Sequence, residues 1–296
     1  MHAAIFEVDQ SLNDPDEHKH DAVAAEKARE QYLNSKSGPL TVLPNSLCYT
    51  HASQVLEKES YARLCQKIGS LQLKYPPDEL KIRKSRFVVP PLLGQLEFVF
   101  HLGNWNQNFS PDLSSGKKYA TCLTMLQYPF SKGSTHIKPS DLAGRRATAS
   151  DAPLIDPKYL QDDGGLDAEL LAYGVSFADR IAATQPLAGV VRGRVYPETD
   201  VDMTDTEGLA RSWVVQNVTS DFHPVGTCAM GGRSGIERGV VDERLKVYGV
   251  KGVRVVDASI MPLQISAHLQ ATVYAIAEKG AAMIQEDMLS SKIVDS

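Results

Sequence analysis

The chain has 296 residues, 43% of them hydrophobic, which is enough to bury a sizeable core in one large domain or two modest ones. Its net charge of −5 and the lack of a basic stripe argue against a nucleic-acid surface. The longest apolar runs, such as residues 96–100, fall far below the roughly 20 residues that span a membrane. Four cysteines without close pairing indicate buried free thiols rather than a zinc site or disulfides.

The first ten residues, MHAAIFEVDQ, lack a basic n-region and a long apolar stretch, so no secretory signal is visible and a cytoplasmic location is the default expectation. Residues 16–33, rich in alanine, glutamate and lysine, predict an amphipathic helix, and residues 53–68 predict a second. Proline pairs at 76–77 and 90–91 predict that residues 75–91 are rich in loops.

Beyond this region, strands and helices are interspersed. Residues 96–101 and 119–127 are apolar and β-branched enough for strands, and residues 132–137 predict a strand entered through a glycine turn. Apolar side chains at helical spacing predict helices over residues 167–184 and 207–218. The fold class is therefore mixed, without regular βαβ alternation.

Two histidines stand out near the C-terminus, His223 in DFHPVGTCAMG and His268 in SAHLQAT. Between them, residues 251–256 predict a strand that ends in Asp257. A long helix follows, with Ser266 as its expected N-cap and His268 in its first turn. A carboxylate at the end of a strand and a histidine at the start of a helix are typical of the sheet edge where α/β proteins hold cofactors.

These stretches resemble the glucose–methanol–choline (GMC) family of flavin oxidoreductases, which includes aryl-alcohol and glucose oxidases. The resemblance rests on residues 223–228 (HPVGTC), 239–262 and 266–272, supported by residues 128–141 and 152–160. It covers most of the chain from residue 119 to 285 and is thinner before it. It therefore implies a partial substrate domain or linker over residues 1–118 and the family's C-terminal domain over residues 119–285.

The resemblance implies an α+β fold, with a substrate-binding domain of antiparallel sheet and helices plus the C-terminal part of an FAD-binding α/β domain. Such a protein normally opens with a strand, a G-x-G-x-x-G turn and a helix that binds the pyrophosphate. The glycine pairs at 164–165 and 231–232 do not supply that turn. The expectation is a C-terminal half whose N-terminal Rossmann segment is missing.

The family motif assigns His223 as the base that takes the hydroxyl proton while hydride leaves the alcohol carbon, since imidazole titrates near neutral pH. Pro224 restricts the backbone of His223 to extended conformations. The resemblance places His268 beside it as a hydrogen-bond partner of the same substrate oxygen, so both rings are expected to face one pocket. The alternatives are a core histidine bonded to a carbonyl at 223 and a solvent-exposed one at 268.

The resemblance also implies FAD contacts. Asp257 and the backbone N–H of Ala258 are expected at the ribityl–phosphate part of FAD. The backbone around Leu269, Gln270 and Ala271, at the start of the helix, is expected at the pyrimidine edge of the flavin, where negative charge builds on reduction. Asp257 could instead merely cap the following turn.

Three functions remain open on the sequence alone. The first is an FAD-dependent alcohol oxidoreductase acting on CH–OH donors, or its C-terminal half working with a separately supplied N-terminal half. The second is a family offshoot that performs a non-redox cyclisation or dehydration. The third is a truncated, non-catalytic remnant. The expected partners are a small-molecule alcohol and that N-terminal half, and neither nucleic acid, a membrane nor a metal is expected.

Overall fold

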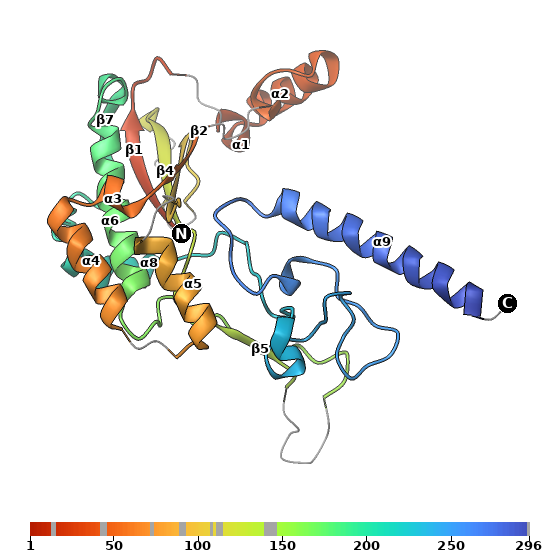
Figure 1. Ribbon diagram of the computed structural model, residues 1–296. Coiled ribbons are helices and arrows are strands. Elements are labelled where there is room, and N and C mark those ends of the chain that lie inside the picture. Colours follow the sequence, from red (N-terminus) through yellow and green to blue (C-terminus); the bar gives the residue numbers. More distant parts are fainter. Residues whose placement is uncertain are drawn as a thin grey trace. The chain divides into compact units, whose positions relative to one another are not determined.

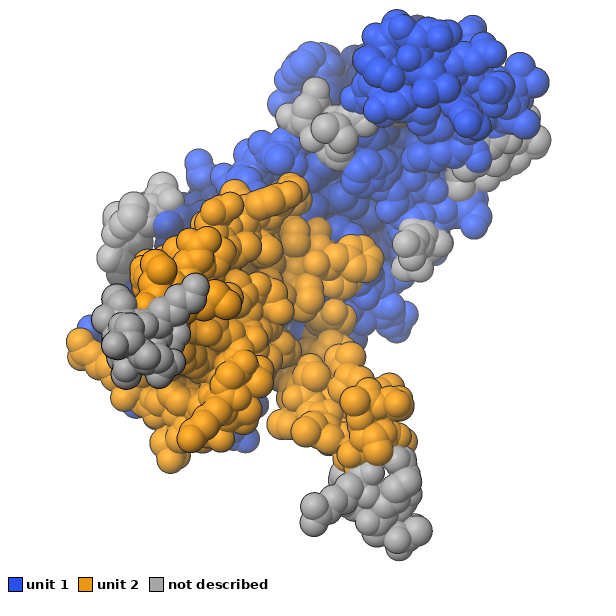
Figure 2. Space-filling model, turned by 90° about the vertical axis from the view of Figure 1, so that its right-hand side faces the viewer, with its two compact units in different colours: residues 1–126, 160–219 blue, residues 127–159, 220–296 orange. Residues whose placement is uncertain are grey.

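The computed structural model describes residues 1–12, 16–41, 46–71, 74–88, 93–106, 109–110, 115–138 and 147–294. The chain forms two compact units, each assembled from two separate stretches (Figure 2). Unit 1 comprises residues 1–126 and 160–219, and unit 2 comprises residues 127–159 and 220–296. Unit 1 thus contains residues from both sides of position 119. The domain boundary between residues 118 and 119, which was predicted from the sequence resemblance, remains a prediction.

Unit 1 is built on an antiparallel sheet whose described strands run in the order β2-β3-β4-β1-β7 (Figure 1). Two of these strands, β3 and β4, confirm the strands predicted at 96–101 and 119–127. The bounds of the five are β1 (His2–Val8), β2 (Ser46–Thr50), β3 (Leu96–Leu102), β4 (Lys118–Leu126) and β7 (Val191–Tyr196).

Strand β1 was not predicted from the sequence. It pairs with β4 on one side and β7 on the other, and six of its seven residues are buried. A strand covered on both faces shows a continuous apolar run rather than the alternation that marks a half-buried strand. The run AAIF at residues 3–6 is of this kind.

The helices of unit 1 confirm the predictions near 16–33, 53–68, 167–184 and 207–218. The first of these is broken at Asp21, whose side chain caps the next helix by accepting from the Ala24 N–H. The fourth contains a π-helical turn, Ala210–Val214. The helices are α1 (Glu17–His20), α2 (Ala22–Ser35), α3 (Ala52–Val55), α4 (Lys58–Ser70), α5 (Pro77–Val88), α6 (Leu166–Ala182), α7 (Thr206–Leu209) and α8 (Val215–Asn217).

The prediction of a loop-rich segment over residues 75–91 was wrong, because α5 occupies most of it. The prolines were interpreted as helix breakers, yet Pro77 is the first residue of α5. A proline at that position costs no intrahelical hydrogen bond, and its fixed φ suits the helix. Asp78 and Glu79 follow in the first turn, where negative charge is favourable.

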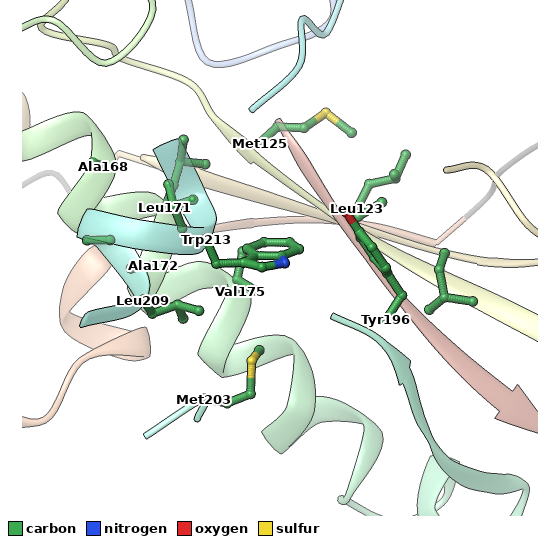
Figure 3. Packing of buried hydrophobic residues seen from close by; sticks show 14 of the residues in the cluster. Leu123, Met125, Ala168, Leu171, Ala172, Val175, Tyr196, Met203, Leu209 and Trp213 are labelled. Atoms are coloured by element: carbon green, nitrogen blue, oxygen red, sulfur yellow. The ribbon is translucent and has the colours of Figure 1, made fainter. Parts of the chain in front are cut away.

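The core of unit 1 lies between α6 and the sheet. Leu171, Ala172 and Val175 on α6 pack with Ile5 of β1 and Leu123 of β4 in one buried cluster. Trp213, Tyr196 and Met203 complete it (Figure 3). The predicted mixed α+β class is thus confirmed. Among the described residues, no helix has the length and hydropathy needed to cross a membrane.

Unit 2 contains little regular structure apart from its last helix. Its elements are the two-stranded sheet β5 (Ser134–His136) and β6 (Leu154–Asp156) and the long helix α9 (Gln270–Val294), blue in Figure 1. Strand β5 confirms the strand predicted at 132–137. Between residues 220 and 270 the chain forms turns, short 3₁₀ helices and isolated bridges.

In unit 1 the ring of His2 is buried without a hydrogen-bond partner among the described residues. His2 is 1% exposed, its ring lies 5.1 Å from that of Trp213, and among the described residues neither of its ring nitrogens finds a hydrogen-bond partner. Burial, followed by the positive charge of the amino terminus, lowers the pKa of His2 to about 3. The folded state therefore keeps this ring neutral where the unfolded chain protonates it.

We predict that His2 makes unit 1 sensitive to mild acid. The folded pKa lies below the ordinary value of 6.5, so this contribution to stability is complete above pH 6.5 and is lost as the pH falls toward 3. Chemical denaturation of the 296-residue chain between pH 7 and 5 should show a shallower decline for His2→Leu than for the parent. The exposed His136→Leu should decline like the parent, and a parental slope for His2→Leu would contradict the prediction.

Candidate functional site

The structure brings His223 and His268 together, as the sequence predicted. Their ring centroids are 5.0 Å apart and the ring planes are nearly perpendicular, at 88°. The His223 side chain is 25% exposed and His268 is exposed, so both rings are accessible to a small molecule. Within the described ranges, no group of three or more histidine, cysteine, aspartate or glutamate side chains could hold a metal ion.

Backbone hydrogen bonds hold the two histidine-bearing segments side by side. The N–H of Cys228 donates to the carbonyl of Ser259 at 3.0 Å, and the N–H of Met230 donates to that of Ile260 at 2.9 Å. Gly226 adopts φ 86°, and a Cβ there would lie 3.3 Å from the carbonyl oxygen of Met261. The glycine of the HPVGTC motif therefore permits both the turn and the close approach.

Asp221 is a further residue at the site. Its Oδ2 lies 2.9 Å from Nδ1 of His223, and its side chain is 27% exposed. Sequence reasoning did not single out this residue. The signal in the sequence was an aspartate two positions before the proposed base. A carboxylate bonded to one imidazole nitrogen determines which of the two ring nitrogens carries the proton.

Asp257 does not end a strand, so that prediction was wrong. Residues 251–256 form only an isolated bridge, between Arg254 and Lys246. Their other backbone hydrogen bonds go to a loop, from the N–H of Val247 to the carbonyl of Val253 and from the N–H of Val255 to that of Leu245. Asp257 instead caps the 3₁₀ turn Ala258–Ile260, and its Oδ1 accepts from the N–H of Ser259 at 2.8 Å. The structure therefore shows Asp257 in the alternative role, as the cap of the following turn. A contact of Asp257 and Ala258 with a cofactor remains a prediction.

Helix α9 begins later than predicted, and Ser266 is not its N-cap. The first helical hydrogen bond runs from the N–H of Val273 to the carbonyl of Leu269, which makes Leu269 the capping residue. The N–H groups of Gln270 and Ala271 precede the helical ladder, and a helix start carries partial positive charge. His268 lies just outside the helix, next to these donors.

A small core fixes α9 on the loops of unit 2. Val241, Leu245 and Ile260 are buried, and Ile276 and Met283 of α9 pack against them. The same face of α9 carries Gly280, where a Cβ would lie 2.4 Å from Cγ1 of Val256. The helix can approach the segment before Asp257 so closely only because residue 280 has no side chain.

Unit 1 contains an open depression of about 330 Å³, formed by residues 201–216. Its two carboxylates serve local turns, since Asp202 accepts from the N–H of Thr204 and Asp205 caps α7 through the N–H of Gly208. None of the predicted site residues lines it. The candidate site is therefore the histidine pair of unit 2.

The histidine pair lies in a part of the chain that a family model matches. The family model for GMC oxidoreductases matches residues 129–277, which is half of the chain and includes both histidines, Asp257 and the start of α9. The chain belongs to the GMC oxidoreductase family, a family of FAD-dependent oxidoreductases.

Curated relatives match only part of their own length. Dehydrogenase mpl7 of Monascus purpureus is 41% identical over 172 residues, which cover 57% of this chain and 25% of the relative. Versicolorin B synthase of Aspergillus parasiticus is 35% identical over 167 residues, which cover 56% of this chain and 24% of the relative. The matched segment thus spans about a quarter of these proteins.

Solved structures share the fold over almost the whole chain. A formate oxidase variant from Aspergillus oryzae matches 97% of this chain and 46% of its own, with a TM-score of 0.76 and 22% identity. A fungal aryl-alcohol oxidase matches 97% of this chain and 47% of its own, with a TM-score of 0.60 and 24% identity. These likenesses confirm the predicted fold of antiparallel sheet and helices, which corresponds to the C-terminal portion of GMC oxidoreductases.

We predict that Gly280→Ala destabilises unit 2. The added methyl group meets Val256, and overpacking of this kind costs about 1–3 kcal/mol. Amide hydrogen exchange over α9 should become faster. Gly69→Ala in α4 is the matched control, because a Cβ there meets nothing within 4 Å and the helix gains about 0.5–1 kcal/mol. Equal protection of α9 in the parent and in Gly280→Ala would show that the contact has no effect.

Proposed function

We propose that the chain forms the substrate-oxidising part of an FAD-dependent oxidoreductase acting on an alcohol CH–OH group. The observation that carries the proposal is the pair of accessible imidazoles, His223 and His268, with ring centroids 5.0 Å apart. Two neighbouring imidazoles can contact one substrate oxygen, and an oxygen that must lose a proton is the centre of alcohol oxidation.

In this proposal His223 is the base. Its imidazole takes the hydroxyl proton, and His268 donates a hydrogen bond that holds the substrate oxygen in place. The chemistry that FAD supplies, when bound, is acceptance of the hydride from the alcohol carbon. The partly exposed position of both rings allows a small alcohol to reach them from solvent.

The residues of unit 2 fit the flavin end of FAD. The N–H groups of Gln270 and Ala271, with Leu269 as the cap, offer donors at a positive helix end to the pyrimidine edge. Asp257 and Ala258 lie at a capped turn that can face the ribityl chain. Residues 1–296 contain no glycine-rich turn for the pyrophosphate, so in this proposal the adenosine end is bound by residues outside this sequence.

A second candidate is a non-redox reaction at the same histidine pair. Versicolorin B synthase, 35% identical over the matched segment, is named as a synthase rather than an oxidase or dehydrogenase. The two candidates differ in a direct observable. Anaerobic mixing with the substrate bleaches the flavin absorbance if the reaction is a hydride transfer and leaves it unchanged if the reaction is a cyclisation or dehydration.

We predict that the 296-residue chain alone binds FAD more weakly than about 1 μM, which corresponds to roughly 8 kcal/mol. The reason is that no phosphate-binding turn is present to hold the pyrophosphate. Titration followed by flavin fluorescence measures this, and FMN should bind about as weakly as FAD. Binding of FAD tighter than this limit would contradict the prediction.

We predict unequal effects of removing the two histidines from an enzyme completed with the part of the Monascus purpureus relative that lies outside the matched segment. His223→Ala should lower turnover of primary alcohols by about 10²–10⁴-fold, the usual contribution of a general base. His268→Ala should lower it less, since water can replace part of a hydrogen bond. The exposed His136→Ala serves as the control.

The opposite order of effects would invert the assignment of base and hydrogen-bond partner. Parental turnover in both variants would remove the chemistry from this site. A completed enzyme that oxidises no alcohol and leaves its flavin unbleached would instead favour the non-redox reaction or a non-catalytic remnant.

A further inference from the structure

The carboxylate of Asp221 contacts one of the two ring nitrogens of His223. Oδ2 of Asp221 lies 2.9 Å from Nδ1 of His223, and both side chains are about three-quarters covered. The His223 ring also faces the ring of His268 in an edge-to-face contact. One ring nitrogen is therefore committed to a carboxylate, and Nε2 is left for another partner.

The backbone between the two residues is bent in an unusual way. Phe222 adopts φ 57°, the left-handed region that an aromatic residue rarely enters. Its N–H donates to Oγ of Ser220 at 2.9 Å, and its side chain is 76% exposed. Packing of the phenyl ring thus does not account for the conformation, whereas the turn itself brings the alternate side chains of Asp221 and His223 into contact. Strained backbone of this kind concentrates at functional sites.

We propose that Asp221 is a positioning residue that holds His223 in the tautomer with its proton on Nδ1. An ionised carboxylate is an acceptor only, so it selects the N–H form at the nitrogen that it contacts. The lone pair then lies on Nε2, where it can receive a proton. This inference rests on the proposed function, in which His223 is the base.

With its own proton on Nδ1, the His223 ring can take up the hydroxyl proton at Nε2. The alcohol O–H bond breaks and its proton bonds to Nε2 of His223. FAD, when bound, would accept the hydride that leaves the carbon as the carbon–oxygen double bond forms. The ring becomes an imidazolium whose Nδ1–H remains bonded to the ionised Asp221, in the manner in which aspartate orients histidine in hydrolytic triads. With the other tautomer, Nε2 carries a proton and cannot accept one.

Nitrogen NMR of the 296-residue chain, labelled with ¹⁵N-histidine, tests this without any activity. At pH 8, where an ordinary imidazole is neutral, Nδ1 of His223 should give a protonated, pyrrole-type signal and Nε2 a pyridine-type signal. His223→Gln assigns these signals by their loss. In Asp221→Asn the amide can donate to Nδ1, so the tautomer should shift toward Nε2–H. Asp221→Glu, which keeps an acceptor, should retain at least part of the Nδ1–H form.

Two controls show whether a change is local. The signals of the exposed His136 should not move in any Asp221 variant, and Asp202→Asn, an exposed aspartate in a turn of unit 1, should leave His223 unchanged. An Nε2–H tautomer in the parent overturns the proposal even if the variants fail to fold. The same tautomer in the parent and in a folded Asp221→Asn also overturns it.

Activity separates this proposal from the proposed function. In the completed enzyme, Asp221→Asn should lower kcat on the order of 10²-fold, the lower part of the range for a general base. KM should stay unchanged, because in this proposal Asp221 acts on the His223 ring and not on the substrate. If Asp221→Asn shifts the tautomer while His223→Ala keeps full turnover, Asp221 positions the ring and the assignment of His223 as base fails.

Discussion

The position of both histidines depends on two backbone hydrogen bonds, from Cys228 to Ser259 and from Met230 to Ile260. They join the segment after His223 to the turn before His268, in a part of unit 2 that has few regular elements. Main-chain atoms make these bonds, and Gly226 leaves room for the close approach of the two segments. Each bond satisfies one main-chain donor and one main-chain acceptor in loops that have no sheet or helix ladder to pair them.

The chemistry assigned to this site requires different environments within a few ångströms. As a base, His223 needs one accessible ring nitrogen and a ring held in a fixed orientation. The carboxylate of Asp221 and the bent backbone at Phe222 can hold the ring, and they leave Nε2 accessible. The start of α9, beside His268, carries backbone N–H donors and the partial positive charge of a helix N-terminus. This combination suits a reaction in which a proton leaves one atom while negative charge develops nearby.

How far the sequence predicted the fold can be judged from particular elements. The helix α6 carries apolar periodicity and the strands β3 and β4 are apolar, β-branched runs, and all three were predicted. The strand β1, which is buried on both faces, was not. The proline at 77 starts α5 instead of ending a helix. At the site, the family motif located both histidines, but the strand before Asp257 and the cap at Ser266 were wrong because loop bonding, not local propensity, decides that region. Asp221 was missed, since its contact depends on an unusual φ at Phe222 that no propensity predicts.

The central claim is that His223 and His268 form one site in the folded chain. A NOESY spectrum of the 296-residue chain with labelled histidines measures this directly. Ring centroids 5.0 Å apart predict cross-peaks between the ring protons of the two residues, together with the cross-peaks inside each ring. The presence of the intra-ring peaks without any between His223 and His268 would contradict the account.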